Sequence, residues 1–314
     1  MRVDNKFARR KPVLKSNEPK KKYILAYEGF KTEPCYFNGI IDSRDDLEIS
    51  SLIEIIPLLR DYNEKGNSHP KNIISELESF LKQSKENKLK VSSIIDIITN
   101  NFLEEKNSNN IRQEFEKSFI KDLNLEINDI ISIDDSDKIL DYIGDFLKKR
   151  KKRNCNNSIS NIKQLLKDNN IEYEESYDDV CIIIDRDKQS FKDEQYDDVV
   201  KMCKKNKFKL YVTNPCFEFW LLMHFDEVLQ MDREKIEQNK KINRNNVRYL
   251  ENELKNIVPK YKKNDIQFYK FKGNIKKAIE NEKYFEEDID GLKQKIGSNI
   301  GKLISEMISI GKNF

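Results

Sequence analysis

Three carboxylate residues of the sequence lie where they could act together. Glu28 directly follows the apolar run 23–27, and Asp185 and Asp187 follow the β-branched run 180–184. Both runs are typical of buried strands, and ligands of open α/β sheets bind beyond the carboxyl ends of the strands. Aspartates two residues apart can face the same side of an extended backbone. The pattern therefore predicts one acidic site built from two strand ends.

Carboxylate oxygens in this arrangement suit Mg²⁺ or Mn²⁺ rather than Zn²⁺. Neighbouring carboxylates repel one another, and a bound cation removes that repulsion. Such a site supports metal-assisted phosphoryl chemistry. The alternative is that each residue only caps a helix or lies in a loop. In a chain that is 36% charged, an Asp-Arg-Asp triplet arises often by chance.

The sequence offers little for other catalytic chemistry. It has two histidines, His69 and His224, without an HExxH motif, and five cysteines without a CxxC pair. We therefore do not expect a zinc site or a histidine-activated nucleophile, and we place His224 in the core with Trp220. Unpaired, scattered cysteines favour the reducing cytoplasm. No apolar run reaches the ~20 residues of a membrane span, so we expect no membrane contact.

Four further residues lie close to the predicted site along the chain. Lys31 and Glu33 come shortly after the first strand, and Asn214 and Glu218 come shortly after the apolar run 210–213. Lys31 could contact a phosphate, Glu33 could add an acidic ligand, and the other two could support the site. The structural alternatives are a surface lysine, the first turn of a helix and an Asn-Pro turn.

Apolar runs and helical periodicities alternate along the chain. Strands are expected at residues 23–27, 49–59, 180–184 and 210–213, with a short one at 267–271 and no other buried strand after residue 231. Helical periodicity occurs within residues 34–41, 73–81, 111–123, 139–147, 159–166, 199–202, 217–225, 250–258, 275–279 and 300–308. Thr32 is expected to cap the first helix, and Ser68 the second. This alternation predicts an α/β fold with a parallel sheet.

The formal net charge of +3 hides a segregation of charge. Residues 1–22 carry nine basic and two acidic groups, and residues 201–314 carry 24 and 16, whereas the regions between them are acidic. One basic run interrupts the acidic part: Lys148, Lys149, Arg150, Lys151, Lys152 and Arg153. This run is either a solvated helix end or a nucleic-acid-binding loop. An acidic pocket within basic surroundings suits a polyanionic substrate.

The changes of composition divide the chain into four parts. They are a flexible basic arm at 1–20, an α/β core at 21–88 plus 177–230, a helical insertion at 89–176 and a mostly helical C-terminal region at 231–314. The insertion is polar and rich in Asn, Ser, Asp and Ile.

Three motifs of the chain resemble those of RloB-like proteins. The segment 28–37 (EGFKTEPCYF) resembles their EGxKTExxYF motif, and 178–187 (DDVCIIIDRD) resembles their strand ending in DRD. The segment 214–225 (NPCFEFWLLMHF) resembles their NPxFExWLLLHF signature. The resemblance covers roughly residues 20–85 and 177–310.

The resemblance implies a TOPRIM-like core, because RloB-like proteins look related to TOPRIM nuclease domains. It implies that Glu28 is a general acid or base near the metal, and that Asp185 and Asp187 bind Mg²⁺. Family members occur beside restriction and abortive-infection loci, often with an SMC/ABC-type ATPase. The resemblance therefore implies an antiphage nuclease that acts on RNA or DNA with an ATPase partner. The insertion at 89–176 departs from the shorter members, so its role does not transfer.

Two other functions stay open on the sequence alone. The polar insertion and the segregated charge also suit a non-catalytic nucleic-acid-binding or regulatory subunit of an ATPase complex. A carboxylate nuclease of an unrelated fold is the third candidate. Association of identical chains into a homo-oligomer is compatible with each of them.

Overall fold

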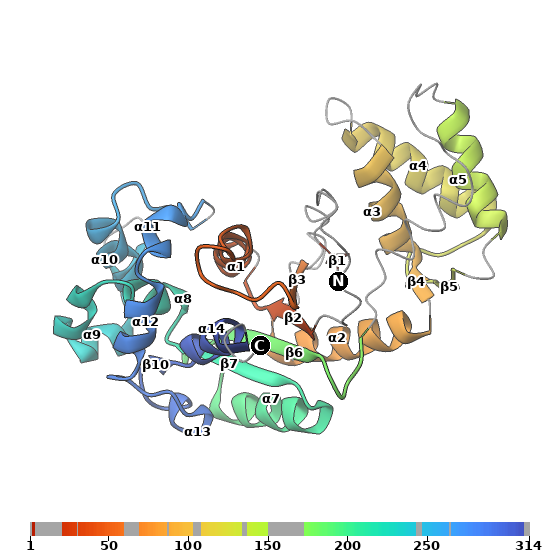
Figure 1. Cartoon of the computed structure of the whole chain (residues 1–314). Coiled ribbons are helices and arrows are strands. Elements are labelled where there is room, and N and C mark those ends of the chain that lie inside the picture. The colour runs from red at the N-terminus through yellow and green to blue at the C-terminus, as the bar shows by residue number, and fades with distance from the viewer. Residues whose placement is uncertain are drawn as a thin grey trace. The chain divides into compact units, whose positions relative to one another are not determined.

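The computed structural model of the 314-residue chain describes residues 2–3, 21–29, 31–59, 69–86, 88–102, 108–133, 137–149, 173–242, 247–263 and 265–310. The chain forms two compact units (Figure 1). One contains Leu77–Glu174 with Met1–Asn5, and the other contains Lys6–Glu76 with Glu175–Phe314. The predicted arm at 1–20 lies almost entirely outside the described residues.

The larger unit is built on a mainly parallel sheet. Its strands lie in the order β3 (Ile53–Leu59), β2 (Lys21–Tyr27), β6 (Asp179–Asp185), β7 (Lys209–Asn214) and β10 (Gly297–Ser298). The first four are parallel, and β10 pairs antiparallel with β7. Runs such as VCIII in β6 are buried on both faces, which is why they lack a polar alternation. The predicted α/β fold with a parallel sheet is confirmed.

Two helical crossovers leave the middle of this sheet in opposite directions. Helix α1 (Thr32–Asp42) connects β2 outward to β3, and α7 (Asp193–Asn206) connects β6 outward to β7. The two helices cover opposite faces of the sheet (Figure 1). The strand order therefore reverses between β2 and β6. In open α/β sheets, ligands bind at the carboxyl ends of the strands beside such a topological switch point.

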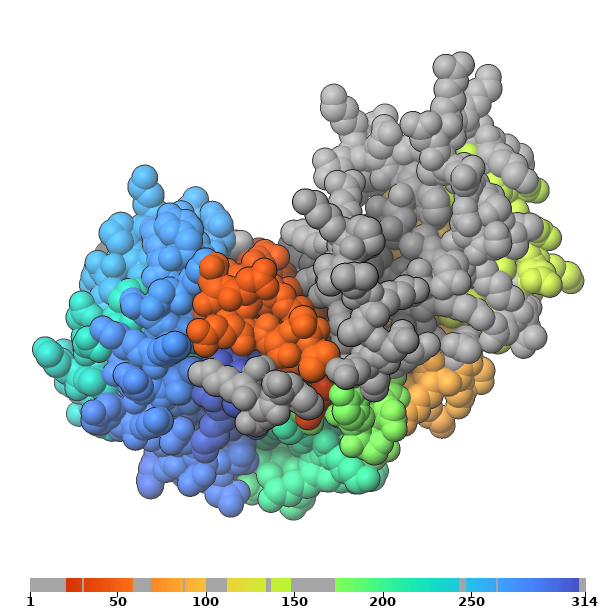
Figure 2. Space-filling model, viewed as in Figure 1, coloured from red at the N-terminus to blue at the C-terminus, as the bar shows by residue number. Residues whose placement is uncertain are grey.

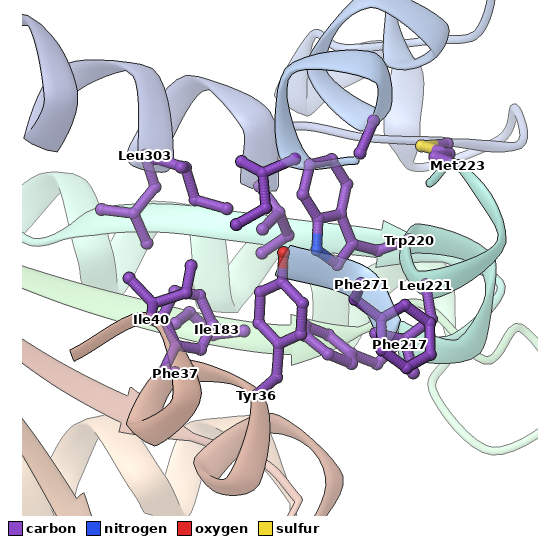
Figure 3. Packing of buried hydrophobic residues seen from close by; sticks show 14 of the residues in the cluster. Tyr36, Phe37, Ile40, Ile183, Phe217, Trp220, Leu221, Met223, Phe271 and Leu303 are labelled. Carbon is purple, nitrogen blue, oxygen red and sulfur yellow. The ribbon is translucent and has the colours of Figure 1, made fainter. Parts of the chain in front are cut away.

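The main core covers the α1 face of the sheet (Figure 3). Tyr36 lies at its centre, with its ring 5.5 Å from Phe217, 5.3 Å from Phe268 and 6.4 Å from Trp220. Its hydroxyl forms a 3.0 Å hydrogen bond with Nε2 of His224. Burial lowers the pKa of His224 to about 4. His224 and Trp220 are thus core residues, as expected.

Short elements that follow β7 surround this core, and most of them contribute buried side chains to it. They are α8 (Phe217–Leu222), the 3-10 helix η4 (Asp226–Gln230), α9 (Arg233–Gln238), β8 (Lys241–Ile242), β9 (Val247–Arg248), α10 (Tyr249–Ile257), α11 (Tyr269–Lys272), α12 (Ile275–Glu282), α13 (Ile289–Leu292) and α14 (Ile300–Ser309). Figure 2 shows α1 (orange) beside these helices (blue), and Lys272 pairs with Asp46 just after α1. Side chains of α1 and of α14, far apart in the sequence, therefore share one core.

Four predictions of secondary structure were wrong in detail. The segment predicted as a strand at 267–271 instead leads into helix α11, which begins at Tyr269, and the strand predicted at 49–59 begins only at Ile53. Thr32 does not cap α1, because its hydroxyl donates to the carbonyl of Lys263 instead. The buried strand β10 was not expected. It escaped prediction because two residues show no periodicity. Gly297 is required there, since a Cβ at this position would lie 1.9 Å from the Glu286 carbonyl oxygen.

The smaller unit has a separate apolar core. It begins within α2 (Pro70–Lys85) and contains β4 (Lys88–Lys90), α3 (Val91–Phe102), α4 (Ser108–Leu123), β5 (Ile130–Ser132) and α5 (Asp137–Lys149). Its buried members include Ile95, Phe115, Phe119 and Ile143. The helices predicted at 111–123 and 139–147 are confirmed, but α3 and the β4–β5 pair were not expected. The predicted helix at 159–166, the Ser68 cap and Arg150–Arg153 lie outside the described residues.

We expect Trp220→Ala to lower the free energy of unfolding by about 3 to 5 kcal/mol, because it removes a fully buried indole. Urea denaturation measures this change. Circular dichroism is the suitable signal, because Trp220 is the sole tryptophan and its replacement removes the tryptophan fluorescence. The matched control is Tyr269→Ala, whose side chain is 72% exposed and should cost no more than about 0.5 kcal/mol. Equal losses in both variants would contradict the packing described.

Candidate active site

The ends of β2, β6 and β7 meet at the switch point through two hydrogen bonds. The backbone N–H of Asp185 donates to Oε2 of Glu28 at 3.0 Å, and Oγ1 of Thr213 donates to Oδ1 of Asp185 at 2.7 Å. The parallel register sets this geometry, because Tyr27 pairs with Ile183 and Asp185 pairs with Thr213. The structure thus brings Glu28 and Asp185 together from strands far apart in the sequence.

Two buried glutamates from helical first turns join this pair. Glu33 of α1 is 5% exposed and Glu218 of α8 is 4% exposed. The carboxylate of Glu33 folds back over Gly29, where a Cβ would lie 2.1 Å from its Oε2 atom. The backbone N–H groups of Glu33 and Gly29 donate hydrogen bonds to this carboxylate. Both glutamates therefore lie with Glu28 and Asp185 at the ends of the strands.

The carboxylates of the cluster disfavour one another's charge. Burial raises the pKa of Asp185 well above its usual value, and the nearby charges of Glu33, Glu28 and Glu218 raise it further. Burial, together with the charge of Glu218, raises the pKa of Glu33 to about 7. We call Glu28, Glu33, Asp185 and Glu218 the carboxylate cluster.

A family model described as RloB-like protein matches residues 111–307, which is more than half of the chain. The chain belongs to the RloB-like family. The matched range contains Asp185 and Glu218 but not Glu28, and it includes much of the segment that we expected to depart from the family. No curated protein and no solved structure matches the chain. Among the described helices of this RloB-like protein, none is long and apolar enough to cross a bilayer.

Asp187 lies beyond β6 and makes different contacts from Asp185. Its Oδ1 accepts from the backbone N–H of Gln189 at 3.1 Å, and its Oδ2 lies 3.2 Å from an Nη atom of Arg248. Between the two aspartates, Arg186 is fully buried and donates to the carbonyls of Phe191 and Lys293. Arg186 therefore fixes the loop, and the two aspartates have different side-chain partners, Thr213 for Asp185 and Arg248 for Asp187.

Two cations from the C-terminal region enter the site. Arg248 pairs with Asp187, and Nζ of Lys263 lies 2.7 Å from Oε1 of Glu218. Burial disfavours the charge of Lys263, but the carboxylate of Glu218 raises its pKa above the usual value. Neither residue was predicted, because neither follows a strand and both lie in a lysine- and arginine-rich region.

The other predicted residues have plainer surroundings. Asn214 is buried, and its Nδ2 donates to the Leu292 carbonyl at 2.8 Å, which ties β7 to α13. Lys31 is exposed and precedes the first residue of α1. His69 lies just before α2, and its Nδ1 accepts from the backbone N–H of Lys71. In the predicted basic run, α5 ends at Lys149.

The donor set suits Mg²⁺, although the protein does not form a full cage. Among the described residues, no three or more His, Cys, Asp or Glu side chains form a group that could hold a metal ion. Mg²⁺ needs fewer protein ligands, since it keeps several waters and binds through one or two carboxylates plus substrate phosphates. Glu28 and Asp185 supply two carboxylates, and a cation between them would relieve the repulsion at Asp185.

We expect Asp185→Asn to raise the free energy of unfolding at pH 7 in EDTA by about 1 to 2 kcal/mol. The pKa of Asp185 is higher in the folded chain than its usual 3.8, so the charged form destabilises the fold above that pH. Chemical denaturation measures the change. Asp187→Asn is the control, because it loses only a half-exposed ion pair and should not stabilise.

We expect the stability in EDTA to fall as the pH rises from 4.5 to about 7, partly through Glu33. Its raised pKa means that the folded state binds this proton more tightly than the unfolded state does. Glu33→Gln should remove part of this slope, on the order of 1 to 3 kcal/mol across the window. Denaturation at several pH values tests this, and the exposed Glu194→Gln should keep the wild-type slope. An unchanged slope in Glu33→Gln would refute the assignment.

Proposed function

We propose that this RloB-like protein is a Mg²⁺-dependent TOPRIM-like nuclease that hydrolyses phosphodiester bonds of RNA or DNA in antiphage defence. The observation that carries the proposal is the pair Glu28–Asp185, joined by a 3.0 Å hydrogen bond across the switch point of a parallel sheet. Ligands of such sheets bind there. The resemblance of the surrounding motifs to RloB-like proteins supports the abortive-infection role.

In this proposal Glu28 and Asp185 hold the metal ion. Bound Mg²⁺ would polarise the scissile phosphate as a Lewis acid. Thr213 orients the carboxylate of Asp185, and the N–H of Asp185 orients that of Glu28. Glu28 also moves the proton of the attacking water. Asp187 is an additional ligand once the half-exposed contact with Arg248 opens.

Basic segments would hold the nucleic acid around this acidic centre. Lys31 lies at the start of α1, three residues after Glu28, where it can contact a phosphate. The run Lys148–Arg153 and the basic N-terminal arm are the other proposed contacts. Association with an SMC/ABC-type ATPase, or with further copies of the chain, belongs to the same proposal, as does a cytoplasmic location.

We expect purified protein to cleave RNA or DNA with Mg²⁺ and to lose activity in EDTA. Glu28→Gln and Asp185→Asn should each lower the cleavage rate by about 10²-fold or more, because each removes a group that acts on the reacting atoms. The matched control is Glu227→Gln, an exposed glutamate of η4. Gel assays with labelled substrates measure the rates.

Two outcomes would overturn the proposal. Equal cleavage by wild type and Asp185→Asn would assign the activity to another site or to a contaminant. Binding of nucleic acid without cleavage, with phage protection retained in Glu28→Gln, would favour the non-catalytic subunit instead.

A further inference from the structure

Lys263 contributes a positive charge to the carboxylate cluster from a loop between α10 and α11. Its Nζ lies 2.7 Å from Oε1 of Glu218 and 3.8 Å from Oε2 of Glu251. Glu218 is almost fully buried, whereas Lys263 keeps 43% of its side chain exposed. The lysine therefore reaches from the surface into the cluster.

The backbone of Lys263 is also tied to the cluster. Its carbonyl accepts a hydrogen bond from the Thr32 hydroxyl at 3.2 Å, and Thr32 directly precedes Glu33. The same residue thus bonds α1 through its main chain and α8 through its ammonium group. This double attachment holds the cation beside both buried glutamates.

By its hydrogen bonds and ion pairs the cluster divides into two halves, although the charge of Glu33 in the second half also acts on Asp185 in the first. Glu28 and Asp185 are joined to each other through the Asp185 N–H. Glu33 and Glu218 interact with each other and with Lys263. Each half has two carboxylates, but only in the second half is a carboxylate, that of Glu218, paired with the Lys263 ammonium group.

We propose that Lys263 is a tethered counter-ion of the Glu33–Glu218 half, so that the cluster takes one divalent ion, at Glu28 and Asp185. This inference rests on the proposed metal dependence and makes it more specific. A lysine ammonium is a compact point charge, and it repels a second cation beside the carboxylate that it pairs with.

Removal of Lys263 leaves Glu218 buried without its ion-pair partner. A buried carboxylate in that state must find another cation or become protonated. In Lys263→Met we expect a second divalent ion to take the place of the ammonium group, whereas Lys263→Arg retains the charge and should exclude it.

Counting Mn²⁺ tests the inference without any substrate. Electron paramagnetic resonance measures the concentration of free Mn²⁺. The difference from the total added Mn²⁺ gives the number of ions bound per chain at saturation. Ions that persist in the double variant Glu28→Gln/Asp185→Asn are subtracted as unrelated sites. We expect one ion in wild type, two in Lys263→Met and one in Lys263→Arg. Addition of Glu218→Gln to Lys263→Met should return the count to one.

Two ions in wild type, or one in Lys263→Met, would overturn the role of Lys263 while leaving the metal-dependent nuclease intact. No ion in wild type would overturn both proposals, so the two failures are distinguishable. Circular dichroism checks that each variant is folded. If Lys263→Met does not fold, Lys263→Gln takes its place. The wild-type count is decisive in either case, because two bound ions in wild type are by themselves enough to refute the role of Lys263.

Discussion

Burial of mutually repelling carboxylates at one edge of the sheet is the constraint on which the site depends. Glu33 and Glu218 are almost fully buried, and their charges add to those of Glu28 and Asp185. Such an arrangement costs folding free energy unless hydrogen bonds and cations compensate it. The Asp185 N–H, the Thr213 hydroxyl and the Lys263 ammonium group supply part of that compensation. The remaining repulsion is the reason that a cation is attractive there.

The topology explains why the charges converge at this place. Helices α1 and α7 leave β2 and β6 toward opposite faces, so the strand order reverses where the ends of these two strands lie side by side. The two glutamates enter from the first turns of α1 and α8. The apolar packing around Tyr36 joins those helices and holds their first turns in place. Core stability and the geometry of the site are therefore linked.

The sequence predicts the parts of this site that follow regular patterns. Buried runs mark β2, β6 and β7, and the residues after them include Glu28 and Asp185. Lys263 and Arg248 could not be predicted in the same way. They lie in a short loop and a two-residue strand, and their partners are distant in sequence, as the separation of 231 positions between Thr32 and Lys263 illustrates. Strand β10 was missed for a related reason, since two residues carry no periodicity.

Gly29 shows how a small residue can control charge. Its backbone is not in the left-handed region, since no described glycine has a positive φ. Its value lies in the missing side chain, because the Glu33 carboxylate occupies the volume where a Cβ would be. Even one methyl group at this position would push that carboxylate aside and change the electrostatic potential at Asp185. Gly29 of the EG pair therefore influences the pKa of the neighbouring carboxyl groups although it carries no charge, because it leaves room for the Glu33 carboxylate.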